Sequence, residues 1–254
     1  MATENRESLW EHSGELLHRT KIALVALFVA SFSVSAIPVQ ITPNYIPLIF
    51  YVFRKMKDLL PEGVELMAVG WVDILWIYVL LSLLLGFIAS SPVIAYEAYK
   101  FLAPALHKHE KRMVLWFIFS FTILFIFGAV FSYSLILPIT YRVLVGFIYT
   151  AGAVPLYSVL DFFTFTILAI FAVGLLFTFP VFSTLLIKMG LISPDYLASK
   201  RREALVGLLI LTAIITPDTT GITMLMLFIP MIVLFELAVQ VGKRVQKPQV
   251  QTGQ

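Results

Sequence analysis

The sequence predicts an all-α membrane protein with six transmembrane helices. Hydrophobic residues make up 60% of the 254 residues and charged residues only 13%, against roughly 45–50% and about 25% in soluble domains. The apolar residues form six runs separated by polar segments, and most basic residues fall on alternate polar segments. We expect one domain over residues 1–244, followed by a disordered polar tail over residues 245–254.

The first three apolar runs are each close to or above the ~20 residues that cross a bilayer. They cover residues 21–39, 71–96 and 113–137. The acid-rich segment before the first run lacks the basic start of a cleavable signal peptide, so we expect it to be retained. Between the first two runs, residues 47–60 predict an amphipathic helix that lies on the membrane surface.

The second half predicts a loop over residues 138–161 and runs over residues 162–187, 204–215 and 222–241. The fifth run is unusually short. The 14 residues between Glu203 and Asp218 give roughly 21 Å of helix, against a hydrocarbon core of about 30 Å. The run is therefore either a short helix buried within the bundle or one that thins the bilayer around it.

The basic residues predict the orientation. With six spans both termini lie on one side, and all but four of the 18 basic residues collect there. The four on the other side are Arg54, Lys55, Lys57 and Arg142. Because positive charge accumulates on cytoplasmic segments, we expect a multi-pass protein of the cell membrane with both termini in the cytoplasm.

The densest polar segment between two apolar runs is P-V-I-A-Y-E-A-Y-K-F-L-A-P-A-L-H-K-H-E-K-R, residues 92–112. Its His107 and His109 have no third ligand at a suitable spacing, which makes a poor metal site. The chain also has no cysteine and no G-x-x-x-x-G-K-[ST] phosphate loop. We therefore predict no metal, no cofactor and no nucleic-acid partner.

Five motifs in series resemble the TatC family, the polytopic receptor subunit of the twin-arginine protein translocase. They are E-H-x-x-E-L-x-x-R before the first run, S-P-V-I-A-Y-E-A-Y-K-F-L-A-P-A-L-H-K-H-E-K-R after the second, G-L-I-S-P-D-Y-L-A-S-K-R-R after the fourth, T-P-D before the sixth and I-P-M-I-V-L-F-E-L within it. The similarity covers about residues 8–244.

The resemblance implies a fold and a function. The fold would be six transmembrane helices curved into a concave cup, with both ends cytoplasmic. The protein would bind twin-arginine signal peptides of folded cargo and act in an oligomeric complex with single-span TatA and TatB type subunits. Transport would be driven by the proton-motive force, and the protein would not be an enzyme.

The signal-peptide site that the resemblance implies comprises Glu15, Arg19, Phe101 and Glu110. A carboxylate accepts the planar fork of a guanidinium in a bidentate manner, which suits Glu15 and Glu110 to paired arginines. Each acid also has an alternative. Glu110 has Lys111 and Arg112 beside it, and Glu15 precedes Arg19 by four residues, the favourable order for a helical ion pair.

Two prolines, Pro92 and Pro104, are expected to shape the turn after the second run. Three polar residues are expected to contact partner helices or a polar network: Thr178, Asp218 and Glu236. Thr178 stands where many family members have a glutamate, so its hydroxyl could hydrogen-bond but not ionise. Asp218 is also explained as a helix cap. Glu236 is also explained as an acid whose side chain extends to the membrane–water interface.

The main alternative function is a proton-coupled transporter of small solutes. Such folds commonly have two repeated halves around a site at the membrane midplane. Here the runs and loops differ in length between the halves, and the apolar runs contain no paired acid and base. A membrane enzyme is disfavoured because no His/Asp/Ser constellation occurs at membrane depth.

Overall fold

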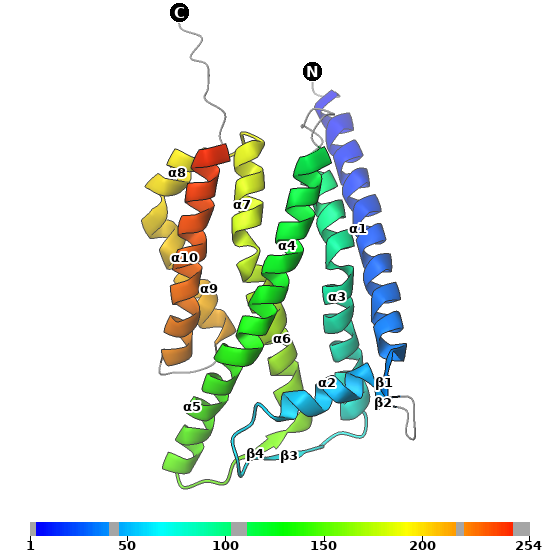
Figure 1. Ribbon diagram of the computed structural model, residues 1–254, viewed down its shortest axis with the longest axis vertical. Helices are drawn as coiled ribbons and strands as arrows, with labels where there is room; N and C mark the ends of the chain where they lie inside the picture. Colours follow the sequence, from blue (N-terminus) through cyan, green and yellow to red (C-terminus); the bar gives the residue numbers. More distant parts are fainter. Residues whose placement is uncertain (1–3, 41–45, 103–110, 217–220, 246–254) are drawn as a thin grey trace, which may run out of the picture.

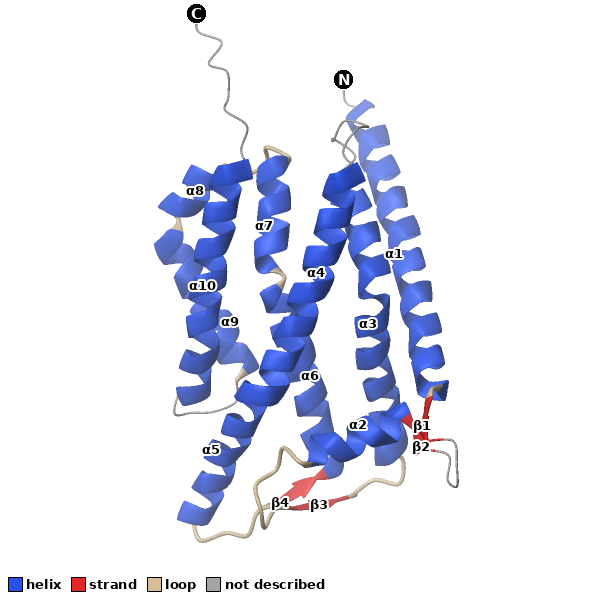
Figure 2. Ribbon diagram, viewed as in Figure 1, coloured by secondary structure: helices blue, strands red, loops and turns tan. Residues whose placement is uncertain are grey.

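The computed structural model describes residues 4–40, 46–102, 111–216 and 221–245, which form a helical bundle with two small sheets (Figures 1 and 2). The helices are α1 (Glu4–Ala36), α2 (Leu48–Lys57), α3 (Asp73–Leu102), α4 (Lys111–Phe131), α5 (Leu137–Thr150), α6 (Val159–Phe177), α7 (Phe179–Lys188), α8 (Pro194–Ser199), α9 (Arg201–Ile215) and α10 (Ile222–Val245). A π-helical turn, η1 (Ser132–Ile136), joins α4 to α5.

Five helical segments of the described chain are long and apolar enough to cross a membrane. They are Gly14–Ala36, Asp73–Phe101, Met113–Thr150, Val159–Lys188 and Ile222–Val245. These segments correspond to the first four and the sixth of the predicted apolar runs. The first starts earlier than predicted and ends at Ala36, three residues before the predicted end, whereas the other four extend beyond their predicted ends. The prediction of an all-helical membrane protein is confirmed.

The predicted loop over residues 138–161 is wrong in its first half, because α4, η1 and α5 form one continuous helical segment. Pro138 cannot donate a backbone hydrogen bond, and a proline in a helix interior commonly kinks or breaks the helix. In the π turn before it, the N–H of Leu137 donates to the carbonyl of Ser132, five residues back. Such local adjustments allow proline inside a membrane helix.

The fourth predicted run is divided at Thr178 into α6 and α7. Pro180 lies in the first turn of α7, where its missing N–H has no helical partner to lose. The carbonyl of Thr178 accepts the N–H of Val181 at 3.0 Å, which starts the new helix. The proline therefore interrupts this segment without ending it.

The bundle core consists of three groups of buried side chains. Ile77, Leu137 and Phe163 belong to a group at the α2 end. A second group joins α6 to α10 and includes Phe177, Met231 and Phe235. A third, around Phe117, Phe121 and Leu185, joins α3, α4 and α7.

The helix predicted over residues 47–60 is confirmed as α2, which ends at Lys57, three residues early, and lies across one end of the bundle (Figure 1). Its location on the membrane surface stays a prediction. Its Phe53 ring stacks on Phe163 of α6, with centroids 4.2 Å apart. Strands β1 (Pro38–Gln40) and β2 (Ile46–Pro47) pair antiparallel beside it. Strands β3 (Glu65–Met67) and β4 (Leu156–Ser158) pair in parallel, with Glu65 opposite Leu156, and connect the segments that follow α2 and α5.

The predicted short fifth run is α9, which has 15 residues and lies at the edge of the bundle against α10 (Figure 1). Within α9 only Leu208 and Thr212 are buried, whereas Ile210 is 56% exposed and Ile214 75% exposed. The alternative of a short helix buried within the bundle is therefore wrong. The paired ends of α9 and α10 stop well short of the level that α5 and α6 reach (Figure 1).

Candidate functional site at the end of the α1–α3 pair

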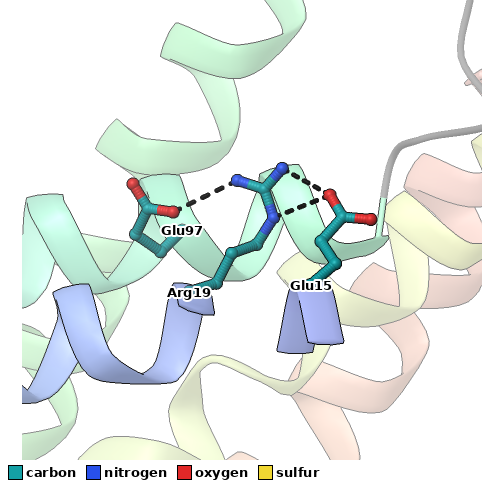
Figure 3. Close-up of polar contacts among 3 residues, drawn as sticks. All are labelled: Glu15, Arg19 and Glu97. Atoms are coloured by element: carbon teal, nitrogen blue, oxygen red, sulfur yellow. Dashed lines mark hydrogen bonds and ion pairs between the residues drawn. The ribbon is translucent and has the colours of Figure 1, made fainter. Parts of the chain in front are cut away.

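An arginine bridges two carboxylates where the start of α1 meets the end of α3 (Figure 3). The Nε and Nη2 atoms of Arg19 lie 3.0 Å and 2.5 Å from Oε1 of Glu15, one turn earlier on α1. The Nη1 atom of Arg19 lies 3.2 Å from Oε2 of Glu97 on α3. We call Glu15, Arg19 and Glu97 the bridge cluster.

Solvent reaches the three members of the bridge cluster unequally. The side chain of Glu97 is 8% exposed, that of Arg19 20% and that of Glu15 35%. A carboxylate as buried as Glu97 needs a cation beside it, because an unpaired buried charge is strongly unfavourable. Arg19 is that cation, and Glu15 is the more accessible of its two partners.

Aromatic and basic side chains surround the bridge cluster on α3. Phe101 follows Glu97 by four residues, so both lie on the same side of the helix, and Phe101 is half-buried. On the neighbouring side, the Nζ of Lys100 lies 4.2 Å from the centroid of the Tyr96 ring. This end of α3 therefore combines a carboxylate, a cation and apolar rings.

Three of the four predicted signal-peptide residues lie in the described chain. Glu15 and Arg19 are in contact, as the helical spacing predicts, and Phe101 is one turn from Glu97. Glu110 lies outside the described residues, so its convergence with Glu15 stays a prediction. The sequence analysis did not predict a role for Glu97. Its position as an acid within the polar segment of residues 92–112 could have indicated one.

The prediction that Pro92 shapes the turn after the second run is wrong. Pro92 lies inside α3, which continues to Leu102. Proline leaves the carbonyl four residues earlier, that of Ile88, without its helical donor. The hydroxyl of Ser91 donates to that carbonyl at 2.8 Å, which restores the hydrogen bond and keeps the helix intact. Pro104 lies outside the described residues.

Two of the three predicted intramembrane polar residues are described, and both have local partners. The buried hydroxyl of Thr178 donates to the carbonyl of Leu175 at 2.6 Å, at the end of its own helix. Oε2 of Glu236 on α10 accepts from Nη2 of Arg201 on α9 at 2.9 Å. Asp218 lies outside the described residues. Contacts with partner helices stay predictions for all three.

A second ion pair lies at the start of α9, close in sequence to Arg201. The Nζ of Lys200 donates to Oε1 of Glu203 at 2.8 Å. This hydrogen bond raises the pKa of Lys200 and lowers the pKa of Glu203, since it favours the charged form of each. Both side chains are half or more exposed, so the pair adds little to stability.

These observations define the class: a polytopic α-helical membrane protein with a carboxylate–guanidinium cluster at the end of the bundle where α1 begins and α10 ends (Figure 1). The sequence model of the family described as Sec-independent protein translocase protein (TatC) matches residues 11–230. The chain therefore belongs to the TatC family.

Relatives and solved structures agree with this assignment. The chain is 34% identical to the Sec-independent protein translocase protein TatC of Aquifex aeolicus, over 92% of this chain and 94% of that protein. It is 33% identical to that of Escherichia coli K12, over 71% and 69%. A crystal structure described as the twin arginine translocase receptor TatC superposes with a TM-score of 0.74, at 31% identity, over 92% of this chain and 99% of that one.

Proposed function

We propose that this protein is the receptor component of a twin-arginine translocase and binds the twin-arginine signal peptides of folded proteins at the cytoplasmic membrane surface. The bridge cluster is the observation that carries the proposal. Glu15 already accepts two hydrogen bonds from a guanidinium, the group that a twin-arginine motif presents. Membership of the TatC family supports the same function.

The proposed topology has six spans in one domain, with α9 as the fifth and both termini in the cytoplasm. The start of α1 and the end of α10 lie at the same end of the bundle (Figure 1), as an even number of crossings requires. The helix ends there carry Arg19, Lys100, Lys188 and Lys243, whereas Arg54 and Lys57 belong to α2 at the opposite end. The positive-inside rule supports a cytoplasmic location for the end with α1.

Recognition would use two carboxylates and an aromatic side chain. We propose that Glu15 and Glu110 each accept one arginine of the motif, since bidentate pairs distinguish arginine from lysine by geometry. Phe101 would contact the apolar part of the signal peptide beside them. Pro104 keeps its proposed role of shaping the turn between the second and third spans.

The proposed role includes the assembly of TatA and TatB type single-span subunits, and export driven by the proton-motive force. The exposed apolar side chains of α9 and the polar residues Asp218 and Glu236 are the proposed contacts for partner helices, and the buried hydroxyl of Thr178 is proposed to belong to a polar network within the bundle. A membrane thinned around the short α9, within a concave arrangement of the six spans, would lower the barrier that folded cargo meets.

Photo-crosslinking to signal peptides tests the receptor function. The full chain in lipid nanodiscs is exposed to two peptides that differ only in an Arg-Arg or a Lys-Lys pair and carry the same photoreactive residue. We expect preferential labelling by the Arg-Arg peptide, with strong reduction by Glu15→Gln and by Glu110→Ala. The control variant is Glu203→Gln, which breaks the ion pair of Lys200 and Glu203 at the start of α9 and leaves the bridge cluster unchanged.

Equal labelling by the two peptides, unaffected by Glu110→Ala, would contradict the proposal. Loss of labelling in the Glu203→Gln control as well would indicate a general effect of charge. Each variant is accepted only if its thermal unfolding matches that of the wild type, so that a loss of labelling reports on the site.

A further inference from the structure

The carboxylate proposed to read a signal-peptide arginine is already occupied by an arginine of the same chain. Arg19 places two donors on one oxygen of Glu15, at 3.0 Å and 2.5 Å. A fork-to-fork pair requires both oxygens of the carboxylate. An incoming guanidinium therefore cannot form the bidentate pair with Glu15 while Arg19 remains in place.

Arg19 also lies where its positive charge opposes that of an arriving arginine. Its side chain is 20% exposed, so solvent screens the repulsion between the two guanidinium groups only in part. Release of Arg19 from Glu15 would remove both obstacles. The cost of that release depends on what else holds Arg19.

Glu97 supplies the second holding point. Its Oε2 already contacts Nη1 of Arg19 at 3.2 Å, and it is the most buried of the three side chains. A carboxylate in that position keeps its cation, because separation would leave a buried charge unpaired. Arg19 can therefore leave Glu15 and remain paired with Glu97 on α3.

We propose that Arg19 is an intramolecular competitor for the arginine site on Glu15, and that Glu97 is a positioning residue that retains Arg19 when a ligand arginine displaces it. The inference rests on the proposed receptor function and adds to it a determinant of affinity. The free protein would keep Glu15 satisfied, and only a ligand that offers a full bidentate pair would exchange with Arg19. Lysine, a point charge, gains less from the exchange.

Two variants separate competition from a structural role. Glu97→Gln weakens the hold of α3 on Arg19, leaves Arg19 on Glu15, and is expected to weaken binding of an Arg-Arg peptide. The double variant Arg19→Gln/Glu97→Gln removes the competitor without leaving a buried carboxylate unpaired. We expect it to bind the same peptide more tightly than the wild type, by roughly twofold to fivefold, the size expected for one exchanged and partly exposed ion pair.

The measurement is fluorescence anisotropy of a labelled Arg-Arg peptide titrated with the full chain in nanodiscs. The matched control is Lys200→Gln/Glu203→Gln, which removes a second ion pair and is expected to leave the affinity unchanged. If Arg19 only ties α1 to α3, the double variant binds as the wild type does or more weakly, and either result overturns the inference.

Failure of the underlying receptor function has a different signature. In that case the wild type binds Arg-Arg and Lys-Lys peptides equally, and Glu15→Gln changes neither. A different result contradicts only the role assigned to Arg19 and Glu97. In that result the wild type prefers the Arg-Arg peptide and its binding depends on Glu15, but the double variant binds the peptide no more tightly than the wild type.

Discussion

Gly86 of α3 lies directly against Ser31 of α1. A Cβ atom on Gly86 would lie 2.7 Å from both the backbone nitrogen and the Cα of Ser31, closer than real Cβ contacts. Small residues allow membrane helices to approach in this way. Ser31 is twelve residues after Arg19, and Gly86 is eleven before Glu97, so this contact in an antiparallel pair sets the register that brings Arg19 to Glu97.

Replacement of Gly86 by alanine is expected to lower the free energy of unfolding by about 1–3 kcal/mol, because the backbones of α1 and α3 must separate. The measurement is reversible unfolding in mixed micelles. Gly146 of α5 is the matched control, since a Cβ there meets no atom within 4 Å. Gly146→Ala is expected to be neutral or to stabilise the protein by up to about 1 kcal/mol. Equal effects at the two sites would show that the α1–α3 contact is not tight.

The hydroxyl of Ser91 is expected to matter only while Pro92 is present. Ser91→Ala leaves the carbonyl of the half-buried Ile88 without a donor, at a cost of about 1 kcal/mol. In the Pro92→Ala background the backbone N–H of residue 92 can donate instead, so the same substitution should cost less. A double-mutant cycle on unfolding free energies measures the difference. Additive effects would contradict this account of how α3 tolerates its proline.

Five segments long and apolar enough to cross a membrane could be predicted from the sequence, because each of their apolar runs is about 20 residues or longer. The continuation of α4 through Pro138 could not, because a proline predicts a helix end unless a π turn precedes it. The buried-helix alternative for α9 was wrong for a related reason. Hydropathy reports how apolar a helix is, but not whether protein or lipid covers it.

At the candidate site, the pairing of Glu15 with Arg19 could be predicted because it needs only one helical turn. The pairing of Arg19 with Glu97 could not, since these residues are 78 positions apart and their contact depends on the register of two helices. That register is set by the close approach of Gly86 and Ser31. A lone glycine among apolar residues gives no sign of which helix it will meet.

Tyr141 of α5 donates or accepts a buried hydrogen bond with Thr166 of α6, at 2.6 Å. Tyr141→Phe is expected to lower the unfolding free energy by about 1–2 kcal/mol, because the phenolic hydroxyl loses this bond and also its longer bond, at 3.3 Å, to the carbonyl of Phe162. Thr166 keeps its own bond to the Phe162 carbonyl at 2.7 Å, which limits the loss. Tyr133→Phe is the control. It removes an exposed hydrogen bond to the carbonyl of Lys55, so we expect a smaller loss of unfolding free energy than in Tyr141→Phe. A larger loss would contradict the expectation that the buried hydrogen bond contributes more to stability.

Glu236 of α10 has two possible uses that substitution of its partner can separate. Its ion pair with Arg201 joins α10 to α9, and side-chain exposures of 37% and 47% limit the pair to less than about 1 kcal/mol. If the pair is the whole role of Glu236, Glu236→Gln and Arg201→Gln should have equal, small effects on unfolding. The double variant should then be no worse than either single variant.

The proposed contact with a partner helix predicts an asymmetry between the same two variants. Glu236→Gln removes the acid, whereas Arg201→Gln frees it to accept a donor from another subunit. We therefore expect co-purification of TatA or TatB type subunits to fall in Glu236→Gln and to be kept in Arg201→Gln, with unfolding nearly unchanged in both. A parallel fall in the two variants would assign Glu236 to the α9–α10 contact alone, since only the shared ion pair is lost in both.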